Sequence, residues 1–181
     1  MFGFKFIKFD AMTYVLQYKN GGIKQEGRGL SFWYYQPTTS IVAIPMGSDD
    51  APFIFEDSTK DFQRVSVQGE ITYQINDPKR LANLLDFTVD VKGKRSSSDY
   101  EKLWQRIVNE AQAAASVYLG NHSLRKSMTS SKDLEKAILT QLQTSEAIQS
   151  IGIQPLSVIV LSVKPTPEMA RALEAETREA L

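Results

Sequence analysis

The segment from Arg64 to Ile75 constrains the fold more than any other part of the chain, because apolar and polar residues alternate along its whole length. Alternate residues of a β-strand point to opposite faces of a sheet, so this pattern predicts a strand with one buried face and one solvated face. The face that we expect to be buried carries Val65, Val67, Gly69, Ile71, Tyr73 and Ile75. The solvated face carries Ser66, Gln68, Glu70, Thr72 and Gln74.

Shorter strands are expected before this segment. Residues 12–19 alternate in the same way, and Asn20-Gly21, a pair that tolerates positive φ, separates them from residues 22–26, which predicts a β-hairpin. Residues 30–35, 39–44 and 53–55 are predicted strands, and residues 47–50 are predicted to form a loop.

Two amphipathic helices are predicted in the second half of the chain. Apolar residues recur every three or four positions across residues 100–119 and across residues 132–150, which is typical of helices with one buried stripe. Ser130, followed three residues later by Asp133, resembles a capping box at the start of the second helix. A shorter helix is expected to begin at Pro78. The stripe of the second long helix consists of Leu134, Ile138, Leu142 and Ile148.

The C-terminal part of the chain predicts a strand and a final helix. Residues 153–163 are apolar at both parities, so we expect an interior strand that is buried on both faces. A helix is predicted from Thr166-Pro167-Glu168 to Leu181, with no stop signal at its end. A helix of about 15 residues is marginally stable alone, so we expect it to pack on a partner or to continue in a longer native protein. Its candidate oligomerisation residues are Met169, Leu173, Glu176 and Ala180.

The residue types that several kinds of chemistry need are absent or scarce. The sequence has no cysteine and a single histidine, His122, which excludes disulfides and thiol chemistry and leaves too few ligands for a zinc site. Twenty-one basic residues balance twenty-one acidic ones, so the chain has no overall attraction for nucleic acid. We expect no catalytic residues, no cofactor and no metal site, and we predict that the protein is not an enzyme.

Two charged clusters allow more than one interpretation. Five acidic residues within residues 49–61 could bind a hard cation or act as paired carboxylates, but their spacing lacks the ligand pattern of a calcium loop. A solvated loop is favoured, and an enzyme that uses these carboxylates is a third hypothesis for function. The basic residues within residues 92–95 could meet lipid phosphate or an acidic partner, although a solvated connector is again favoured. The acidic residues are Asp49, Asp50, Glu56, Asp57 and Asp61, and the basic ones are Lys92, Lys94 and Arg95.

The most unusual local composition lies in residues 2–9, which contain four Phe, one Ile and two Lys. Phe2, Phe4 and Phe6 alternate at strand period, so one interpretation is a strand whose Phe face packs on the sheet. The other is an interfacial anchor, in which aromatic rings lie at the lipid headgroup level while Lys5 and Lys8 meet anionic lipid. No apolar run approaches the roughly 18 residues that a spanning helix needs. The candidate membrane-contact residues are Phe2, Phe4, Lys5, Phe6, Ile7, Lys8 and Phe9.

Two segments of the chain resemble the SPFH (Band 7) family, which includes stomatins, prohibitins and flotillins. Residues 65–78, with the sequence VSVQGEITYQINDP, resemble the signature strand of that family. Residues 152–179, an apolar strand followed by the helix that begins at Pro167, resemble its last strand and the start of its coiled-coil stalk. The order of the hairpin, the signature strand, the two helices and the final strand also agrees, so the resemblance covers nearly the whole chain.

The resemblance implies an α+β fold in which two or three amphipathic helices pack on a mixed, curved β-sheet. It implies one domain over residues 1–165 and the beginning of a stalk, cut short, over residues 166–181. It also implies a non-enzymatic scaffold that forms homo-oligomers and gathers on membranes. Such scaffolds organise membrane microdomains or regulate membrane-protein partners such as proteases, and the resemblance brings no catalytic residues.

The N-terminus departs from this family pattern. Many relatives begin with a membrane hairpin or spanning helix, whereas only residues 2–9 precede the domain here. We therefore expect an intracellular, cytoplasmic protein that binds the lipid surface peripherally. The alternative is a soluble interaction or chaperone-like module that presents a sheet edge or its helices to client proteins and touches no membrane. In that alternative Phe2, Phe4 and Phe6 are buried.

Overall fold

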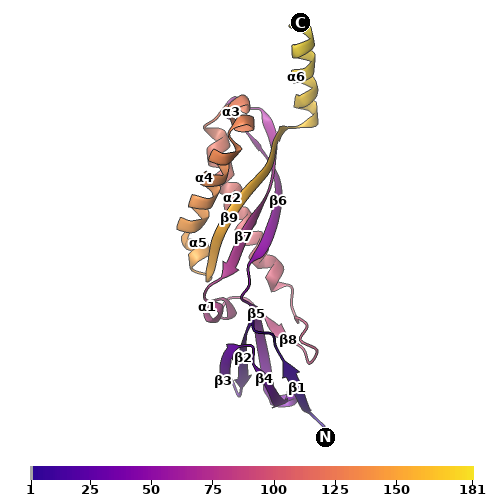
Figure 1. The fold of residues 1–181 in the computed structure, drawn as a ribbon, viewed down its shortest axis with the longest axis vertical. Coiled ribbons are helices and arrows are strands. Elements are labelled where there is room, and N and C mark those ends of the chain that lie inside the picture. Colours follow the sequence, from indigo (N-terminus) through magenta and orange to yellow (C-terminus); the bar gives the residue numbers. More distant parts are fainter. Residues whose placement is uncertain (1) are drawn as a thin grey trace. The chain divides into compact units, whose positions relative to one another are not determined.

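The computed structural model describes residues 2–181, which form an α+β fold with two compact units (Figure 1). The first unit contains the chain up to Asp49 together with Gln74–Gln105 and Ala147–Gln154. The second contains Asp50–Tyr73, Arg106–Glu146 and Pro155–Leu181. This mixture of strands and helices confirms the predicted fold class.

Two antiparallel sheets make up most of the first unit. β1 (Phe4–Lys8) pairs with β4 (Ser31–Tyr35), and the other sheet has the strand order β3-β2-β5-β8. Asn20 and Gly21 have positive φ angles of 53° and 80°, so the predicted hairpin is confirmed with the turn that its sequence favours. The larger sheet consists of β2 (Thr13–Lys19), β3 (Gly22–Arg28), β5 (Thr39–Pro45) and β8 (Thr88–Val89).

Apolar side chains from both sheets form one core in the first unit. Phe9 and Leu30 pack against this core and are partly buried. Burying an aliphatic or aromatic side chain contributes about 1.5–3 kcal/mol, so the cluster holds the β1–β4 pair against the larger sheet. The buried residues of the cluster are Ile7, Val15, Phe32, Tyr34, Ile41, Ala43 and Val89.

Short helices complete the first unit. The 3-10 helix η1 (Gln36–Thr38) follows β4, and α1 (Pro78–Ala82) begins at Pro78, as predicted. The Asp77 carboxylate caps α1 by accepting a hydrogen bond from the Arg80 N–H at 3.1 Å.

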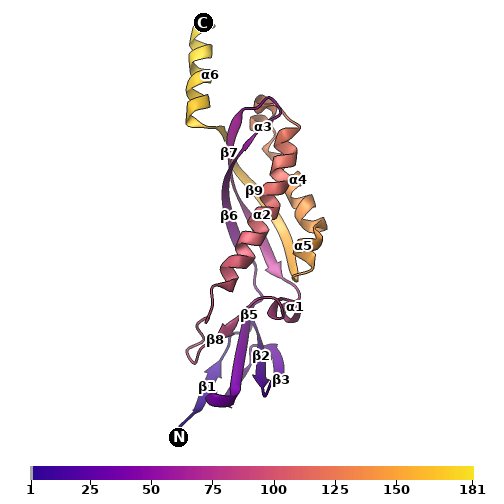
Figure 2. The ribbon, with the colours of Figure 1, turned by 180° about the vertical axis from the view of Figure 1, so that it is seen from behind.

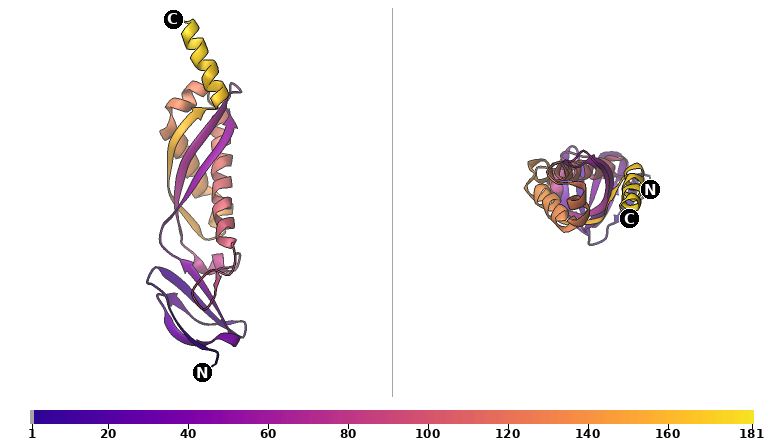
Figure 3. Two further views of the ribbon diagram at one scale, coloured as in Figure 1. Left: turned by 90° about the vertical axis from the view of Figure 1, so that its right-hand side faces the viewer. Right: turned by 90° about the horizontal axis from the view of Figure 1, so that it is seen from above.

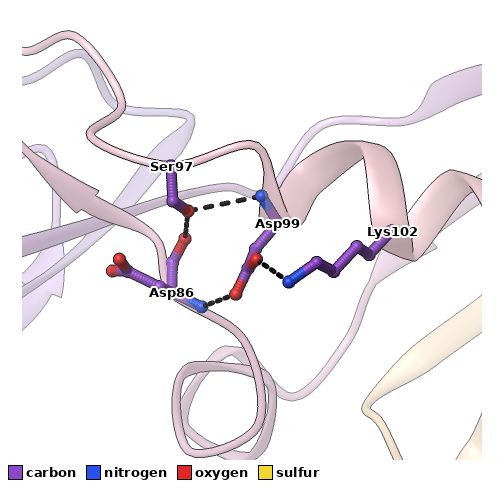
Figure 4. A network of polar contacts seen from close by, with 4 residues as sticks. All are labelled: Asp86, Ser97, Asp99 and Lys102. Atoms are coloured by element: carbon purple, nitrogen blue, oxygen red, sulfur yellow. Dashed lines mark hydrogen bonds and ion pairs between the residues drawn. The ribbon is translucent and has the colours of Figure 1, made fainter.

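A polar network fixes the start of α2 (Asp99–Gly120), the longest helix (Figure 4). The Asp99 carboxylate accepts a hydrogen bond from the Asp86 N–H at 2.7 Å and pairs with the Lys102 ammonium at 2.6 Å. The Ser97 hydroxyl donates to the Asp86 carbonyl oxygen at 2.8 Å. These contacts link Asp86, which precedes the basic residues 92–95, to the first turn of α2.

The second unit is a three-stranded sheet with helices on one face (Figures 2 and 3). Its strand order is β6-β7-β9, so β7 (Arg64–Ile75), the segment with the alternating pattern, lies in the centre. The outer strands are β6 (Asp49–Ser58) and β9 (Ile153–Pro165). Besides α2, the helices are α3 (Leu124–Thr129), α4 (Ser131–Thr144) and α5 (Glu146–Gln149).

The alternation of β7 determines which sheet face the helices cover. Val65, Val67 and Ile71 are buried, as predicted, and so are the apolar stripes of α2 and α4. Gly69 lies on the same face, where a Cβ atom would approach the Ile159 carbonyl oxygen to 2.3 Å and the Phe53 ring to 2.6 Å. Glycine therefore allows the neighbouring strands and rings to pack closely at this position.

The two outer strands differ from the prediction. β9 was expected in the sheet interior, but it lies at an edge of the sheet, and Leu156, Ile159 and Leu161 on its outer face are exposed. Apolar residues at both parities thus reflect an exposed apolar face rather than burial on both sides. β6 extends over ten residues and begins at Asp49, within the predicted loop.

The helix predicted over residues 132–150 is interrupted in the structure at Ser145. This residue has an extended backbone (φ −67°, ψ 119°) that separates α4 from α5. The expected capping box is absent as well, since the Ser130 hydroxyl does not cap α4 and donates instead to the Lys126 carbonyl oxygen at 2.6 Å.

The final helix, α6 (Pro167–Glu179), follows Thr166 as predicted. None of its residues is buried within the described part of the chain. No helix formed by residues 2–181 combines the length and the apolar character that crossing a bilayer requires.

Candidate functional site

The pairing of β1 with β4 gathers four aromatic side chains on one face. Phe4 lies opposite Tyr35 and Phe6 lies opposite Trp33 in the antiparallel register. The ring centroids of each pair are 5.2 Å apart and the rings are tilted, a geometry that contributes about 0.5–1.5 kcal/mol per pair beyond area burial. We call the side chains of Phe4, Phe6, Trp33 and Tyr35 the aromatic face.

The aromatic face is open to solvent, whereas Ile7, Phe32 and Tyr34, on the other side of the two strands, point into the core. The exposed fractions are 54% for Phe4, 50% for Phe6, 69% for Trp33 and 41% for Tyr35. Ile7, which lies between Phe6 and Lys8, is buried, and so are Phe32 and Tyr34 on β4. Phe2 is fully exposed as well, so the interpretation in which the N-terminal Phe side chains pack on the sheet is wrong.

One of the two strands that carry the aromatic face is basic. Lys5 and Lys8 of β1 are exposed, and neither β1 nor β4 contains an acidic residue. Three of the predicted contact residues are not available on this surface, because Ile7 is buried, Phe9 packs partly against the core and Lys5 lies on the opposite side of β1.

Tyr34 lies on the buried side of the aromatic face, and Gly3 lies at its end. Burial, followed by the nearby Asp90 carboxylate, raises the pKa of the Tyr34 phenol beneath it. Gly3 has a φ of 88°, and its carbonyl oxygen accepts a hydrogen bond from the Gln36 N–H at 2.7 Å. A Cβ atom at Gly3 would lie 2.6 Å from the Tyr35 ring, so glycine gives this ring room at the end of the face.

Trp33 and Tyr35 were not among the predicted contact residues. Their placement depends on the pairing of β1 with β4, which are separated along the chain by a complete hairpin. The aromatic residues of the predicted strand 30–35 were a signal, but periodicity does not say which strand lies beside it.

A surface of this composition suits the boundary between water and an apolar phase. Tyr and Trp combine an apolar body with a polar group, and they are enriched where one end of the side chain is apolar and the other is wet. The exposed Lys8, on the same side of β1 as Phe4 and Phe6, adds a favourable interaction with anionic groups in the same layer.

The acidic residues within residues 49–61 do not form a common site. Asp50 accepts a hydrogen bond from the Thr72 hydroxyl at 2.6 Å, and Glu56 pairs with Arg64 at 3.0 Å. Asp49 accepts a hydrogen bond from the Tyr100 hydroxyl, and Asp57 accepts one from the Ser116 hydroxyl. Within residues 2–181, no group of three His, Cys, Asp or Glu side chains is placed to hold a metal ion. These carboxylates therefore connect strands and helices.

His122 has a structural role in the loop after α2. Its Nδ1 atom lies 2.7 Å from the Tyr118 carbonyl oxygen, and its ring stacks on the Tyr118 ring with the centroids 4.0 Å apart. The His122 carbonyl oxygen accepts a hydrogen bond from the Lys60 N–H at 2.9 Å. The imidazole therefore helps to order the loop.

The basic connector forms a hydrogen-bonded turn. The Asp90 carboxylate accepts hydrogen bonds from the backbone N–H groups of Lys94 at 2.9 Å and Lys92 at 2.8 Å, and these bonds lower its pKa. The Arg95 guanidinium lies over the Tyr100 ring, 4.0 Å from its centroid. Arg95 is thus engaged with the protein, while Lys92 and Lys94 are exposed.

The candidate oligomerisation residues lie along α6 and directly after it. Met169 and Leu173 are partly exposed, and Glu176 and Ala180 are exposed. Because the three- and four-residue spacing places them along one side of a helix, they form a stripe that the described chain does not cover.

Comparison with known proteins gives one match. The family model described as the SPFH domain / Band 7 family matches residues 9–180. The matched region includes β4 and begins immediately after β1, so it covers one of the two strands that form the aromatic face. No curated protein matches the chain. With a family match over nearly its whole length, the protein belongs to the SPFH domain / Band 7 family.

Proposed function

We propose that this protein is a non-enzymatic scaffold that binds the surface of a membrane peripherally and self-associates there. The observation that carries the proposal is the aromatic face, four exposed rings in register on two strands, with Lys8 on the same side of β1 and no acidic residue in either strand. Membership of a family whose members commonly oligomerise and associate with membranes supports the same function.

The chemistry of the aromatic face matches a lipid headgroup region. Trp33 and Tyr35 supply amphipathic rings, Phe4 and Phe6 supply apolar area, and Lys8, on the same side of β1, meets anionic lipid. Each lysine near such a surface contributes on the order of 1 kcal/mol, and this contribution decreases with salt. One copy therefore binds weakly and reversibly.

Self-association converts this weak contact into stable attachment. When several copies are joined, each additional aromatic face binds at a high effective concentration, and the assembly gains avidity without new contacts. The stripe formed by Met169, Leu173, Glu176 and Ala180 is the surface that we propose for helix-to-helix association. In this role the protein gathers lipids or membrane-protein partners around its assembly.

The alternative function is a soluble interaction or chaperone-like module, and its main structural expectation is not met. It required Phe2, Phe4 and Phe6 to be buried, and all three are exposed. An exposed aromatic face can still bind an apolar segment of a client protein. The test therefore has to measure whether the protein binds lipid at all.

Vesicle flotation tests the proposal, and the structure determines the variant. Deleting residues 2–9 would remove Ile7 from the core, so we use Phe6→Ser together with Trp33→Ser, which changes only the exposed side of β1 and β4. Phe62→Ser is the matched control, because Phe62 is an exposed aromatic residue of the second unit. Thermal unfolding verifies that all three proteins fold.

We expect the unaltered chain and the control to float with vesicles of phosphatidylcholine and phosphatidylglycerol at low salt, and to float less at moderate salt. The double variant should stay at the bottom of the gradient. Flotation of the double variant to the same extent as the unaltered chain would place the membrane surface elsewhere, for example at residues 92–95. Absence of flotation for every protein at both salt concentrations would contradict the proposal and favour the soluble module.

A further inference from the structure

We infer that the turn between β6 and β7 presents Phe62 as an anchor for a protein partner whose surface has an apolar pocket bordered by acidic residues. This inference rests on the scaffold role in the proposed function, because it names the surface by which the scaffold holds a protein partner. The surface consists of the Phe62 ring and the exposed cationic side chains of Lys60, Arg125 and Lys126, all in the second unit. We call it the Phe62 surface.

Phe62 has a backbone conformation and an exposure that the fold itself does not require of a large aromatic residue. Its side chain is 89% exposed, so the ring contributes little buried area to the core. Its φ angle is 59°, in the left-handed region, where the Cβ atom of an L-residue comes too close to the following carbonyl oxygen. Glycine is the residue that a turn position of this kind normally carries. The sequence therefore places a bulky, exposed ring where the turn favours glycine.

Hydrogen bonds hold the turn in this conformation. The Phe62 N–H donates to the Thr59 carbonyl oxygen at 2.9 Å, and the Thr59 N–H donates to the Gln63 carbonyl oxygen at 2.9 Å. The buried Thr59 hydroxyl donates to the Asp61 carboxylate at 2.6 Å, and this carboxylate also accepts the Leu124 N–H of α3 at 3.0 Å. Strained residues persist where the surrounding structure over-determines them, and they cluster at functional sites. The backbone that carries the ring is therefore fixed before a partner binds.

Unpaired positive charges lie near this turn. The Lys60 N–H donates to the His122 carbonyl oxygen at 2.9 Å, so the turn lies beside the loop that leads to Arg125 and Lys126 in α3. All three cationic side chains are exposed, and none of them forms an ion pair within residues 2–181. The Asp61 carboxylate is held by the hydrogen bonds of the turn and of α3. Acidic groups of a partner can therefore pair with these cations without breaking an existing ion pair.

These features favour a protein pocket over a lipid surface as the occupant. A fluid headgroup layer accepts an aromatic ring from a backbone of any conformation, whereas a shaped pocket rewards a ring on a fixed backbone, because less entropy is lost on binding. Headgroup contacts favour Trp and Tyr, and Phe lacks the polar group that those rings place in water. A few central anchors, often aromatic or arginine side chains, carry most of the binding energy in protein interfaces. Phe62 and Arg125 are therefore the expected anchors of this contact.

The thermal stability of Phe62→Gly tests whether the ring serves the fold, with no partner present. We expect this variant to melt about 2–4 °C higher than the unaltered chain, because glycine adopts positive φ without strain and little buried area is lost. Lys60→Gly is the control, since Lys60 is exposed in the same turn and its φ angle is not positive, and we expect it to melt at a lower temperature. A lower melting temperature of Phe62→Gly would show that the ring stabilises the fold and would overturn the inference.

Photo-cross-linking in cells of the native organism identifies the partner. The photoreactive residue p-benzoylphenylalanine replaces Phe62 in one chain, and in the control chain it replaces Ile54, which is 71% exposed in the same unit. We expect one protein to be joined to position 62 and not to position 54, and mass spectrometry should place the joined site beside Asp or Glu residues. A lipid product at position 62, or no product specific to that position, would overturn the inference.

The captured protein is then purified, and its dissociation constant for the chain is measured without lipid at low and moderate salt. We expect Phe62→Gly to weaken binding by at least about tenfold, as removal of an interface anchor does, and Ile54→Ser to leave binding unchanged. Lys60→Glu together with Arg125→Glu should slow association, most strongly at low salt. Equal affinity of Phe62→Gly and the unaltered chain would contradict the inference.

Failure of this inference is distinct from failure of the membrane proposal, because the stability and affinity measurements contain no lipid. In vesicle flotation, Phe62→Ser should bind vesicles as the unaltered chain does, since the aromatic face is intact. Loss of partner binding together with unchanged flotation therefore supports the inference. Reduced flotation of Phe62→Ser would overturn it, because the Phe62 surface would then be a lipid contact.

Discussion

Asp61 connects the turn between β6 and β7 to the first turn of α3. Its Oδ1 atom accepts hydrogen bonds from the Thr59 hydroxyl at 2.6 Å and from the Leu124 N–H at 3.0 Å. These bonds, the one from Thr59 most strongly, hold the pKa of Asp61 below the ordinary value of about 3.9 for aspartate. Asp61 therefore has a structural role, as do the other acidic residues within residues 49–61.

The lowered pKa of Asp61 predicts how its contribution to stability depends on pH. The ionised form is favoured in the folded state, so its stabilisation is complete above the unfolded-state pKa and is lost as the pH falls through the folded-state pKa. We expect Asp61→Asn to lower the melting temperature at pH 7. The difference from the unaltered protein should shrink as the pH decreases below about 4.

Thermal unfolding between pH 7 and pH 3 measures this difference. Glu179→Gln removes one exposed negative charge near the end of α6 and is the control, for which we expect no change at pH 7. A difference between Asp61→Asn and the unaltered chain that stays constant over the whole pH range would contradict this account of Asp61.

At the scale of whole elements, the edge of β9 depends on α4. The Glu135 carboxylate accepts the Val160 N–H at 2.9 Å, and it also pairs with Lys132 at 3.1 Å within α4. The Gln143 side chain approaches the Pro155 carbonyl oxygen at 3.5 Å further along the same strand. Helix side chains thus cover backbone groups that an edge strand would otherwise present to another chain.

Glu135→Ala should therefore destabilise the protein and promote aggregation. Leaving a backbone donor without its partner costs about 1–3 kcal/mol of unfolding free energy. Lys132→Ala is the matched control, because it removes the ion pair and keeps the bond to Val160. Urea unfolding and light scattering compare the two variants, and equal stability with equal scattering would show that the bond to Val160 has no protective role.

Local sequence patterns predicted the elements whose own residues indicate which of their faces is buried or where the chain turns. The alternation of β7, the Asn20-Gly21 hairpin and the stripe of α2 were all confirmed. β9 was misplaced because apolar residues at both parities look the same in an interior strand and in an edge strand with an exposed apolar face. The aromatic face was half predicted, since its second strand is set by long-range pairing that periodicity does not contain.

At the scale of the whole molecule, the proposed function combines a weak lipid contact with repeated self-association. The aromatic face belongs to the first unit, and the stripe on α6 belongs to the second. The two activities are therefore separable by substitution. Loss of the aromatic face should abolish vesicle binding without changing self-association in solution. Leu173→Asp, in the stripe on α6, should weaken self-association and leave the weak lipid contact of a single copy unchanged.

The central claim is that the aromatic face enters the lipid headgroup region, and the fluorescence of Trp33 tests it most directly. The chain has two tryptophans, Trp33 and Trp104, so Trp104→Phe leaves Trp33 as the only reporter. On addition of vesicles of phosphatidylcholine and phosphatidylglycerol, the emission of this variant should shift to the blue, and lipids brominated near the headgroup end of their chains should quench it. Emission that stays unchanged while the protein floats with the same vesicles would contradict the account, because the protein would then bind lipid through another surface.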